Sequence, residues 1–193
     1  MTMQKKVVTF FLLFLGLLWF WVSVIQCSGQ DLRECVRERY LSQVGIREKS
    51  GHNDGKAVEM YLASCRLQAG APWCAAFVNW CLQSCGAPAA GSGWSPDWFP
   101  VSKIIWAGGT GKDKTRGLSR DSGALPQRGD VLGIYFPSKG RVAHVLFCEE
   151  WRGESVITVE GNTNEKGSRE GDGVYRKIRL TAQIYVAARW IPK

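Results

Sequence analysis

Residues 71–80 read Ala-Pro-Trp-Cys-Ala-Ala-Phe-Val-Asn-Trp and predict an amphipathic helix with Cys74 in its first turn, behind a Pro-Trp entry. The dipole and the unpaired N–H groups of a helix N-terminus favour a thiolate over a thiol, and they offer a donor to a developing oxyanion. Cys74 is therefore the candidate nucleophile. The alternative is a small buried thiol on a helix face, which is a fair description of Cys81 on nearly the same face.

Two later segments carry the polar groups that a nucleophilic thiol needs. Residues 142–147 predict a strand with His144 in an apolar run, and residues 158–162 end the next strand with Glu160 and Asn162. Histidine can act as the base, and either Glu160 or Asn162 can accept its ring N–H and support the imidazolium. The alternatives are a core histidine satisfied by the backbone and, for Gly161 and Asn162, a turn that ends the strand.

The backbone N–H of Cys74 is expected to stabilise an oxyanion together with one upstream side chain. Asn53 is the first candidate for that donor and His52 the second, and Trp73 is counted with Asn53 as an oxyanion- or substrate-binding residue. Asn53 has an alternative role as a turn residue ahead of Asp54, which is expected to cap the following helix.

Hydrophobic periodicity predicts three helices and then five strands. The helices are expected over residues 31–44, from about 55 to 67, and from Cys74 to about 85; the strands over residues 131–136, 141–149, 154–160, 174–180 and 183–190. Tight turns between consecutive strands indicate an antiparallel sheet. Helices that precede a sheet in this way indicate an α+β fold with a single core.

Alternation along residues 141–149 also predicts which way the histidine faces. It puts Val142, His144, Leu146 and Cys148 on one face, expected to lie toward the Cys74 helix.

Between the helices and the strands, residues 87–125 predict a long loop rich in Gly, Ser and Pro. Its aromatic residues Trp94, Trp98, Phe99 and Trp106 either line a cleft or fill the side of the core.

The first 30 residues predict an export leader ahead of a single domain at 31–193. Lys5 and Lys6 precede residues 7–25, which carry no charge and are rich in Phe, Leu and Trp. The segment is a signal peptide cleaved after small residues near Cys27, a lipidation signal at Cys27, or a retained membrane anchor. In each case the two lysines place the domain across the membrane, at the periplasmic or extracellular face of a bacterial envelope.

Net charge indicates which binding partners suit the protein, and the cysteine pattern indicates whether a metal site or a disulfide is expected. The net charge of +8 becomes +6 without the leader, which suits an anionic partner such as cell wall or lipid headgroups. Export and scattered Lys and Arg argue against nucleic acid. The chain has no C-x-x-C pair, so neither a metal nor another cofactor is expected. A disulfide is expected from Cys81 or Cys85 to Cys35 or Cys65 on another helix.

Four short motifs together resemble the CHAP amidase/peptidase family, a relative of the NlpC-type peptidoglycan hydrolases. Trp73-Cys74, Gly129-Asp130-Val131, Ala143-His144-Val145 and Glu160-Gly161-Asn162 occur in the family's order and at its approximate spacing, within a resemblance that covers roughly residues 45–193. The resemblance implies a papain-like (NlpC-type) fold with N-terminal helices packed on an antiparallel sheet. It also implies that Cys74, His144, Glu160 and Asn162 are the catalytic residues.

The function implied by the resemblance is that of an exported peptidoglycan hydrolase. It would cut an amide bond of the wall peptide, as an N-acetylmuramoyl-L-alanine amidase or as an endopeptidase. One alternative is a catalytically silent module that binds the cell wall or serves as a scaffold. Such a module would not need Cys74, His144, Glu160 and Asn162 together, which argues against it. Another is an exported amidase that acts as a toxin on competitors, with the same chemistry.

Overall fold

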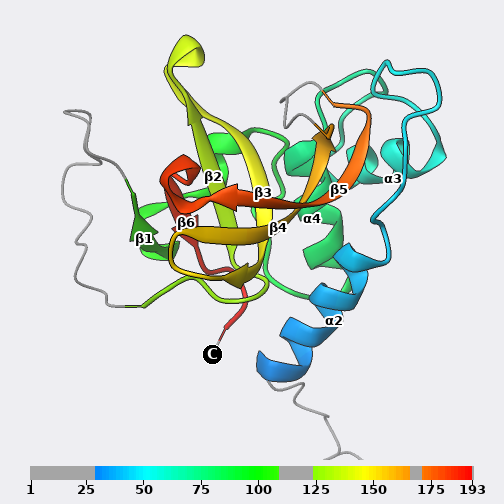
Figure 1. The fold of residues 1–193 in the computed structure, drawn as a ribbon. Coiled ribbons are helices and arrows are strands. Elements are labelled where there is room, and N and C mark those ends of the chain that lie inside the picture. Colours follow the sequence, from blue (N-terminus) through cyan, green and yellow to red (C-terminus); the bar gives the residue numbers. More distant parts are fainter. Residues whose placement is uncertain (1–28, 109–123, 166–170, 193) are drawn as a thin grey trace, which may run out of the picture.

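The described residues form three α-helices that gather against one side of a six-stranded antiparallel sheet (Figure 1). The computed structural model describes residues 29–108, 124–165 and 171–192. The helices are α2 (Gly29–Leu41), α3 (Lys56–Ser64) and α4 (Cys74–Ser84). The predicted α+β class and the order of helices before sheet are confirmed. Within the described ranges no helix is long and apolar enough to span a membrane, and the predicted leader segment at 7–25 lies outside them.

The sheet has the strand order β1-β6-β2-β3-β4-β5. Its strands are β1 (Ile104–Ala107), β2 (Val131–Phe136), β3 (Arg141–Trp151), β4 (Ser155–Thr163), β5 (Gly173–Leu180) and β6 (Val186–Ala188). The prediction missed β1, because its four residues lie inside a stretch rich in Gly, Ser and Pro. It also made the last strand too long: a 3-10 turn, Thr181–Gln183, precedes the short β6.

Two hydrophobic clusters sandwich the sheet. The larger joins the helices to one face and contains Phe77 and Val78 of α4 together with Val145, Phe147 and Val159 of the sheet. The smaller lies on the opposite face and contains Leu132, Leu146, Cys148, Val156, Ile184 and Ala187. Helix α3 buries Val58, Tyr61 and Leu62, as its periodicity predicts. Asp54 does not cap α3: its carboxylate accepts hydrogen bonds from Ser50 instead, and Gly55 precedes the helix.

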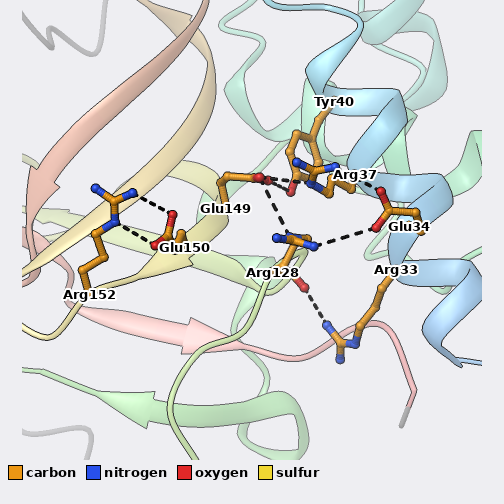
Figure 2. A network of polar contacts seen from close by, with 8 residues as sticks. All are labelled: Arg33, Glu34, Arg37, Tyr40, Arg128, Glu149, Glu150 and Arg152. Carbon is orange, nitrogen blue, oxygen red and sulfur yellow. Dashed lines mark hydrogen bonds and ion pairs between the residues drawn. The ribbon is translucent and has the colours of Figure 1, made fainter.

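Helix α2 is fixed to the sheet by two buried carboxylates, Glu149 and Asp130, of which Figure 2 shows Glu149 with its partners. Glu149, near the end of β3, accepts hydrogen bonds from the Tyr40 hydroxyl and from Arg37 Nε at 3.0 Å, and Arg37 also pairs with Glu34. Asp130, which is fully buried at the entry of β2, pairs with Arg33 at 3.2 Å and with Arg189 at 2.7 Å. Buried carboxylates need such partners, so these contacts define where α2 lies.

A disulfide between Cys35 and Cys85 joins α2 to the end of α4. It is one of the pairings that the sequence left open. Cys65, Cys74, Cys81 and Cys148 are free thiols. In the chain-entropy model, closing a loop across 50 residues stabilises the folded state by about 4 kcal/mol. The helix that begins with Cys74 is thereby tied covalently at its other end.

Candidate active site

Cys74 is the first residue of α4, and close packing against β4 fixes the start of that helix. Gly161 of β4 has no side chain at the point of contact: a Cβ there would lie 2.7 Å from the Trp73 ring and 2.8 Å from Phe77. Trp73 is fully buried, and its Nε1 donates to Glu48 Oε1 at 2.8 Å. As the first helical residue, Cys74 has a backbone N–H without an intrahelical acceptor. The residue as a whole is 5% exposed.

The strand that carries His144 does not alternate regularly. A register shift between Ile134 and Tyr135 of β2 leaves Ala143 of β3 without a partner, because Ile134 lies opposite His144 while Tyr135 lies opposite Val142. Val142 and Val145 consequently both join the helix-side cluster, whereas Leu146 and Cys148 lie on the opposite face. The predicted common face for these residues is therefore wrong. A bulge of this kind re-aims side chains next to active sites.

Strands β3 and β4 separate where the two predicted catalytic side chains project. Their backbone pairing starts at Phe147 opposite Val159, so His144 and Glu160 lie beyond it. There the side chains interact: His144 Nε2 donates to Glu160 Oε2 at 3.0 Å, with both residues buried. The predicted contact between base and orienting residue is present, and it comes from Glu160.

The imidazole and the thiol are coupled as a buried pair. His144 Nε2 is bonded to Glu160, whereas Nδ1 is buried without a hydrogen-bond partner among the described residues. Burial disfavours the charged ring, but interactions with Cys74 and then Glu160 outweigh it and raise the pKa of His144 to about 9. Burial likewise disfavours the thiolate, but His144, the Val145 backbone N–H and the Ser95 hydroxyl hold the pKa of Cys74 below its ordinary value.

These opposite shifts favour a thiolate and an imidazolium over the neutral pair. The shifts arise from hydrogen bonding between the ring and the thiol and then from their opposite charges, although the Nδ1–sulfur contact falls short of an ordinary hydrogen bond. Catalytic hydrogen bonds of unliganded sites are commonly long and shorten when substrate is bound. The arrangement can therefore supply a nucleophile that is already deprotonated and an acid that already holds the proton.

Glu160 is the centre of a fully buried polar network. Its carboxylate accepts from Arg179 Nε at 2.5 Å and from Arg179 Nη2 at 2.6 Å, and from Thr158 Oγ1 at 2.5 Å, in addition to His144. Burial opposes the charged carboxylate, but the Arg179 fork and His144 outweigh it and keep the pKa of Glu160 far below its usual range. Glu160 is thus a permanent anion, which fixes the His144 tautomer and stabilises the imidazolium.

Asn162, near the end of β4, binds the backbone just before helix α4. In the amide orientation that satisfies both of its polar atoms, Oδ1 accepts from the Trp73 backbone N–H at 3.0 Å and Nδ2 donates to the Gly171 carbonyl at 3.2 Å. The residue has a left-handed backbone with φ of 53°. In this structure Asn162 binds the backbone of the residue before Cys74, and the ring N–H of His144 is bound by Glu160 instead.

The structure does not bring the upstream candidates to the thiol. Asn53 donates from Nδ2 to the Gly70 carbonyl at 3.2 Å, and its own backbone N–H binds Glu48. His52 is exposed and contacts Ser50. Glu48 instead bridges Asn53 and Trp73, which makes Trp73 a residue that supports the helix entry. The expectation of Asn53 or His52 as the oxyanion donor is therefore not supported by the geometry.

Ser95 is the side chain that sequence reasoning missed beside the thiol. It begins a 3-10 helix, Ser95–Trp98, and its Oγ lies 3.9 Å from Cys74 Sγ in a buried position. The loop aromatics divide between the two predicted roles. Trp98 is fully buried and packs edge-on against Trp190, whereas Trp94 is 50% exposed. No motif marks Ser95 in the sequence, because a serine before proline in a loop is ordinary turn chemistry.

Two cavities flank the Cys74–His144 pair. The first, of about 450 Å³, reaches Cys74 and is lined also by Ala71, Pro72, Ser92, Trp94, Ser95 and Arg141. The second, of about 410 Å³, reaches His144 and is lined also by Tyr135, Phe136, Arg179, Gln183 and Tyr185. We call them the thiol-side and histidine-side cavities.

Among the described residues no cluster of three or more His, Cys, Asp and Glu could hold a metal ion.

Comparison with known protein families gives one result. The model of the CHAP domain family matches residues 67–162, a segment that begins before α4 and ends at Asn162. It contains Cys74, His144, Glu160 and Ser95, and it stops short of Arg179. No curated protein and no solved structure was found to match the chain.

Proposed function

We propose, from the premise that this chain belongs to the CHAP domain family, that it is a cysteine hydrolase cutting an amide bond in the peptide part of peptidoglycan. CHAP domains are generally amidases or peptidases that act on peptidoglycan, which implies a location in the cell envelope. The observation that carries the finer proposal is the buried series Cys74, His144, Glu160, in which the pKa of the thiol is lowered and that of the ring is raised. Such paired shifts in a cleft are typical of catalytic groups.

Acylation would begin with attack of the Cys74 thiolate on the amide carbonyl carbon. The C–S bond forms, the carbonyl electrons move to oxygen, and the oxyanion accepts the Cys74 backbone N–H. The Ser95 hydroxyl, 3.9 Å from the sulfur, is our candidate for the second donor. His144 then gives its Nδ1 proton to the leaving nitrogen as the C–N bond breaks, so the amine departs neutral.

Deacylation would use the same groups in reverse. Neutral His144, still fixed through Nε2 by Glu160, takes a proton from water while the water oxygen attacks the thioester. The thiolate leaves and the carboxylic acid product is released. Glu160 accepts no proton in either step, because the Arg179 fork keeps it ionised. A binding or scaffold module would gain nothing from these buried charges, whose desolvation costs free energy.

Export remains part of the proposal. We infer that residues 1–30 carry the domain across the inner membrane to the periplasmic or extracellular face and, where they are retained, anchor it. The test is a fusion of a reporter enzyme after Lys193 that is active only outside the cytoplasm. A fusion that is made at full length but whose reporter stays inactive would contradict the location and, with it, access to the wall.

The activity is tested by digestion of purified peptidoglycan with the full chain in mild detergent. Mass analysis of the released fragments identifies the bond: a free lactyl group on the sugar indicates the muramoyl-alanine amidase reaction, and new termini within the peptide indicate an endopeptidase. Cys74→Ser should release nothing, whereas Cys148→Ser removes a thiol on the opposite face of the sheet and should leave release intact. Fragments that persist in Cys74→Ser would refute the assignment.

A further inference from the structure

The two cavities have different chemical roles if the proposed function holds. The acyl half of the substrate becomes bonded to Cys74 Sγ, so it occupies the thiol-side cavity. The amine half receives its proton from His144, so it leaves through the histidine-side cavity. Charge in the thiol-side cavity can therefore select the acyl half of the substrate.

Apart from Cys74, whose thiolate is paired with the His144 cation, Arg141 is the one charged side chain among the described residues that line the thiol-side cavity. The remaining wall is neutral and is built largely of small or apolar residues. Among the described residues, no carboxylate lies within ion-pair distance of Arg141. A cation that faces an otherwise neutral cavity without a counter-ion is suited to an anion supplied by the ligand.

The guanidinium is held in a defined place. Its central carbon lies 3.8 Å from the centroid of the Trp94 ring, and Nη1 donates to the Val142 carbonyl at 3.0 Å. Trp94 precedes the 3-10 helix that begins with Ser95, and Arg141 is the first residue of the strand that carries His144. Stacking on an aromatic face orients the planar fork while its other N–H groups stay available, so less side-chain entropy is lost when an anion binds.

We propose that Arg141, stacked on Trp94, binds a free carboxylate on the acyl half of the substrate and makes the enzyme select unamidated wall peptide. This rests on the endopeptidase form of the proposed function, in which the acyl half is peptide, and adds a specificity residue to it. A glutamyl residue that is linked through its side chain keeps its α-carboxyl group free, or carries it as an amide. A guanidinium distinguishes these two forms, because only the carboxylate accepts a charge-assisted, bidentate pair.

The test compares one wall preparation before and after its carboxylates are converted to carboxamides with carbodiimide and ammonia. Initial rates at low wall concentration are measured for the full-length chain, Arg141→Gln and Lys139→Gln. Lys139 is an exposed cation two residues before Arg141 that does not line the cavity, so its variant reports the general attraction of a basic protein to an acidic wall.

The wild-type chain should cut the untreated wall at least about tenfold faster than the amidated wall, since a hydrogen-bonded pair of opposite charges is stronger than a hydrogen bond to a neutral amide. Arg141→Gln should lose this preference by slowing on untreated wall alone, and Lys139→Gln should keep it. Trp94→Ala should fall between, because the guanidinium remains but is no longer oriented.

Three outcomes would overturn the inference. The first is equal cutting of both walls by the wild type. The second is equal slowing of Arg141→Gln on both walls, as a purely structural role requires. The third is loss of the preference in Lys139→Gln as fully as in Arg141→Gln. Each of these leaves the hydrolase assignment intact as long as fragments are released in a Cys74-dependent manner. Absence of Cys74-dependent release from either wall would instead remove the proposed function, and this inference with it.

Discussion

His144 and Glu160 are joined side chain to side chain, Nε2 to Oε2 at 3.0 Å, at the place where their strands have stopped pairing through the backbone. Beyond the pair Phe147 and Val159 the two strands are therefore linked by side chains, and a buried histidine meets a buried carboxylate beside the start of α4.

Exchange of the Glu160 carboxylate for an amide should separate its role from that of Asn162. Glu160→Gln removes the anion that supports the imidazolium and leaves the Arg179 guanidinium without a counter-ion. We therefore expect kcat/KM to fall by about two to three orders of magnitude. Asn162→Ala should lower activity by displacing the start of α4, without a change in the pH at which activity declines. Equal pH profiles for the two variants would contradict this division.

The pH dependence of acylation should have its upper limit set by His144. The reactive form is the pair of thiolate and imidazolium, which is present above the pKa of Cys74 and lost as pH rises through the pKa of His144, about 9. Measurements of kcat/KM against pH should therefore decline around pH 9. A decline centred near 6.5, the ordinary value for histidine, would show that the ring is not held as a cation.

Alkylation should distinguish Cys74 from the other free thiols. Burial raises the pKa of Cys81 well above its ordinary value, and that of Cys148 as well, whereas the pKa of Cys74 is lowered. At about pH 6, where ordinary thiols are almost wholly protonated, iodoacetamide should label Cys74 first. Peptide mass mapping over time measures this order. Faster labelling of Cys81 or Cys148 would contradict the predicted thiolate.

Loss of the disulfide should destabilise the fold without touching the site chemistry. Replacing both Cys35 and Cys85 with serine frees a loop of 50 residues, and the free energy of unfolding should fall by about 4 kcal/mol. Urea titration measures this change. At low temperature, where the variant remains folded, turnover should stay near the wild-type level. A loss of activity with unchanged stability would give the bridge a catalytic role.

Much of the fold follows from periodicity, and the errors have identifiable causes. The boundaries of β2 match its apolar run, and α4 starts at Cys74, because local pattern and burial agree there. The common face predicted for Val142, Leu146 and Cys148 was wrong because a bulge at Ala143 breaks the alternation, and a bulge depends on the partner strand. The strand β1 was missed because it pairs with β6, a contact between residues far apart in the sequence.

The candidate site was only partly accessible to sequence reasoning. Motifs predict that Cys74, His144 and Glu160 meet, whereas nothing local marks Arg179. Arg179 lies between Ile178 and Leu180, and the usual interpretation buries the two apolar residues and exposes the arginine. The structure does the reverse: Ile178 is 70% and Leu180 62% exposed, while Arg179 is buried against Glu160. Here the need to neutralise a buried carboxylate outweighs the burial of apolar side chains.

The attachment of α2 limits how far the enzyme could reach. The carboxylates Asp130 and Glu149 and the Cys35–Cys85 bridge hold this helix against the domain from its first turns. Only residues 26–28 separate the uncharged run from Gly29, and a fully extended chain of that length spans about 10 Å. If the leader is retained in the bilayer, the domain has almost no tether, and it would cut only the wall strands that come down to the membrane surface.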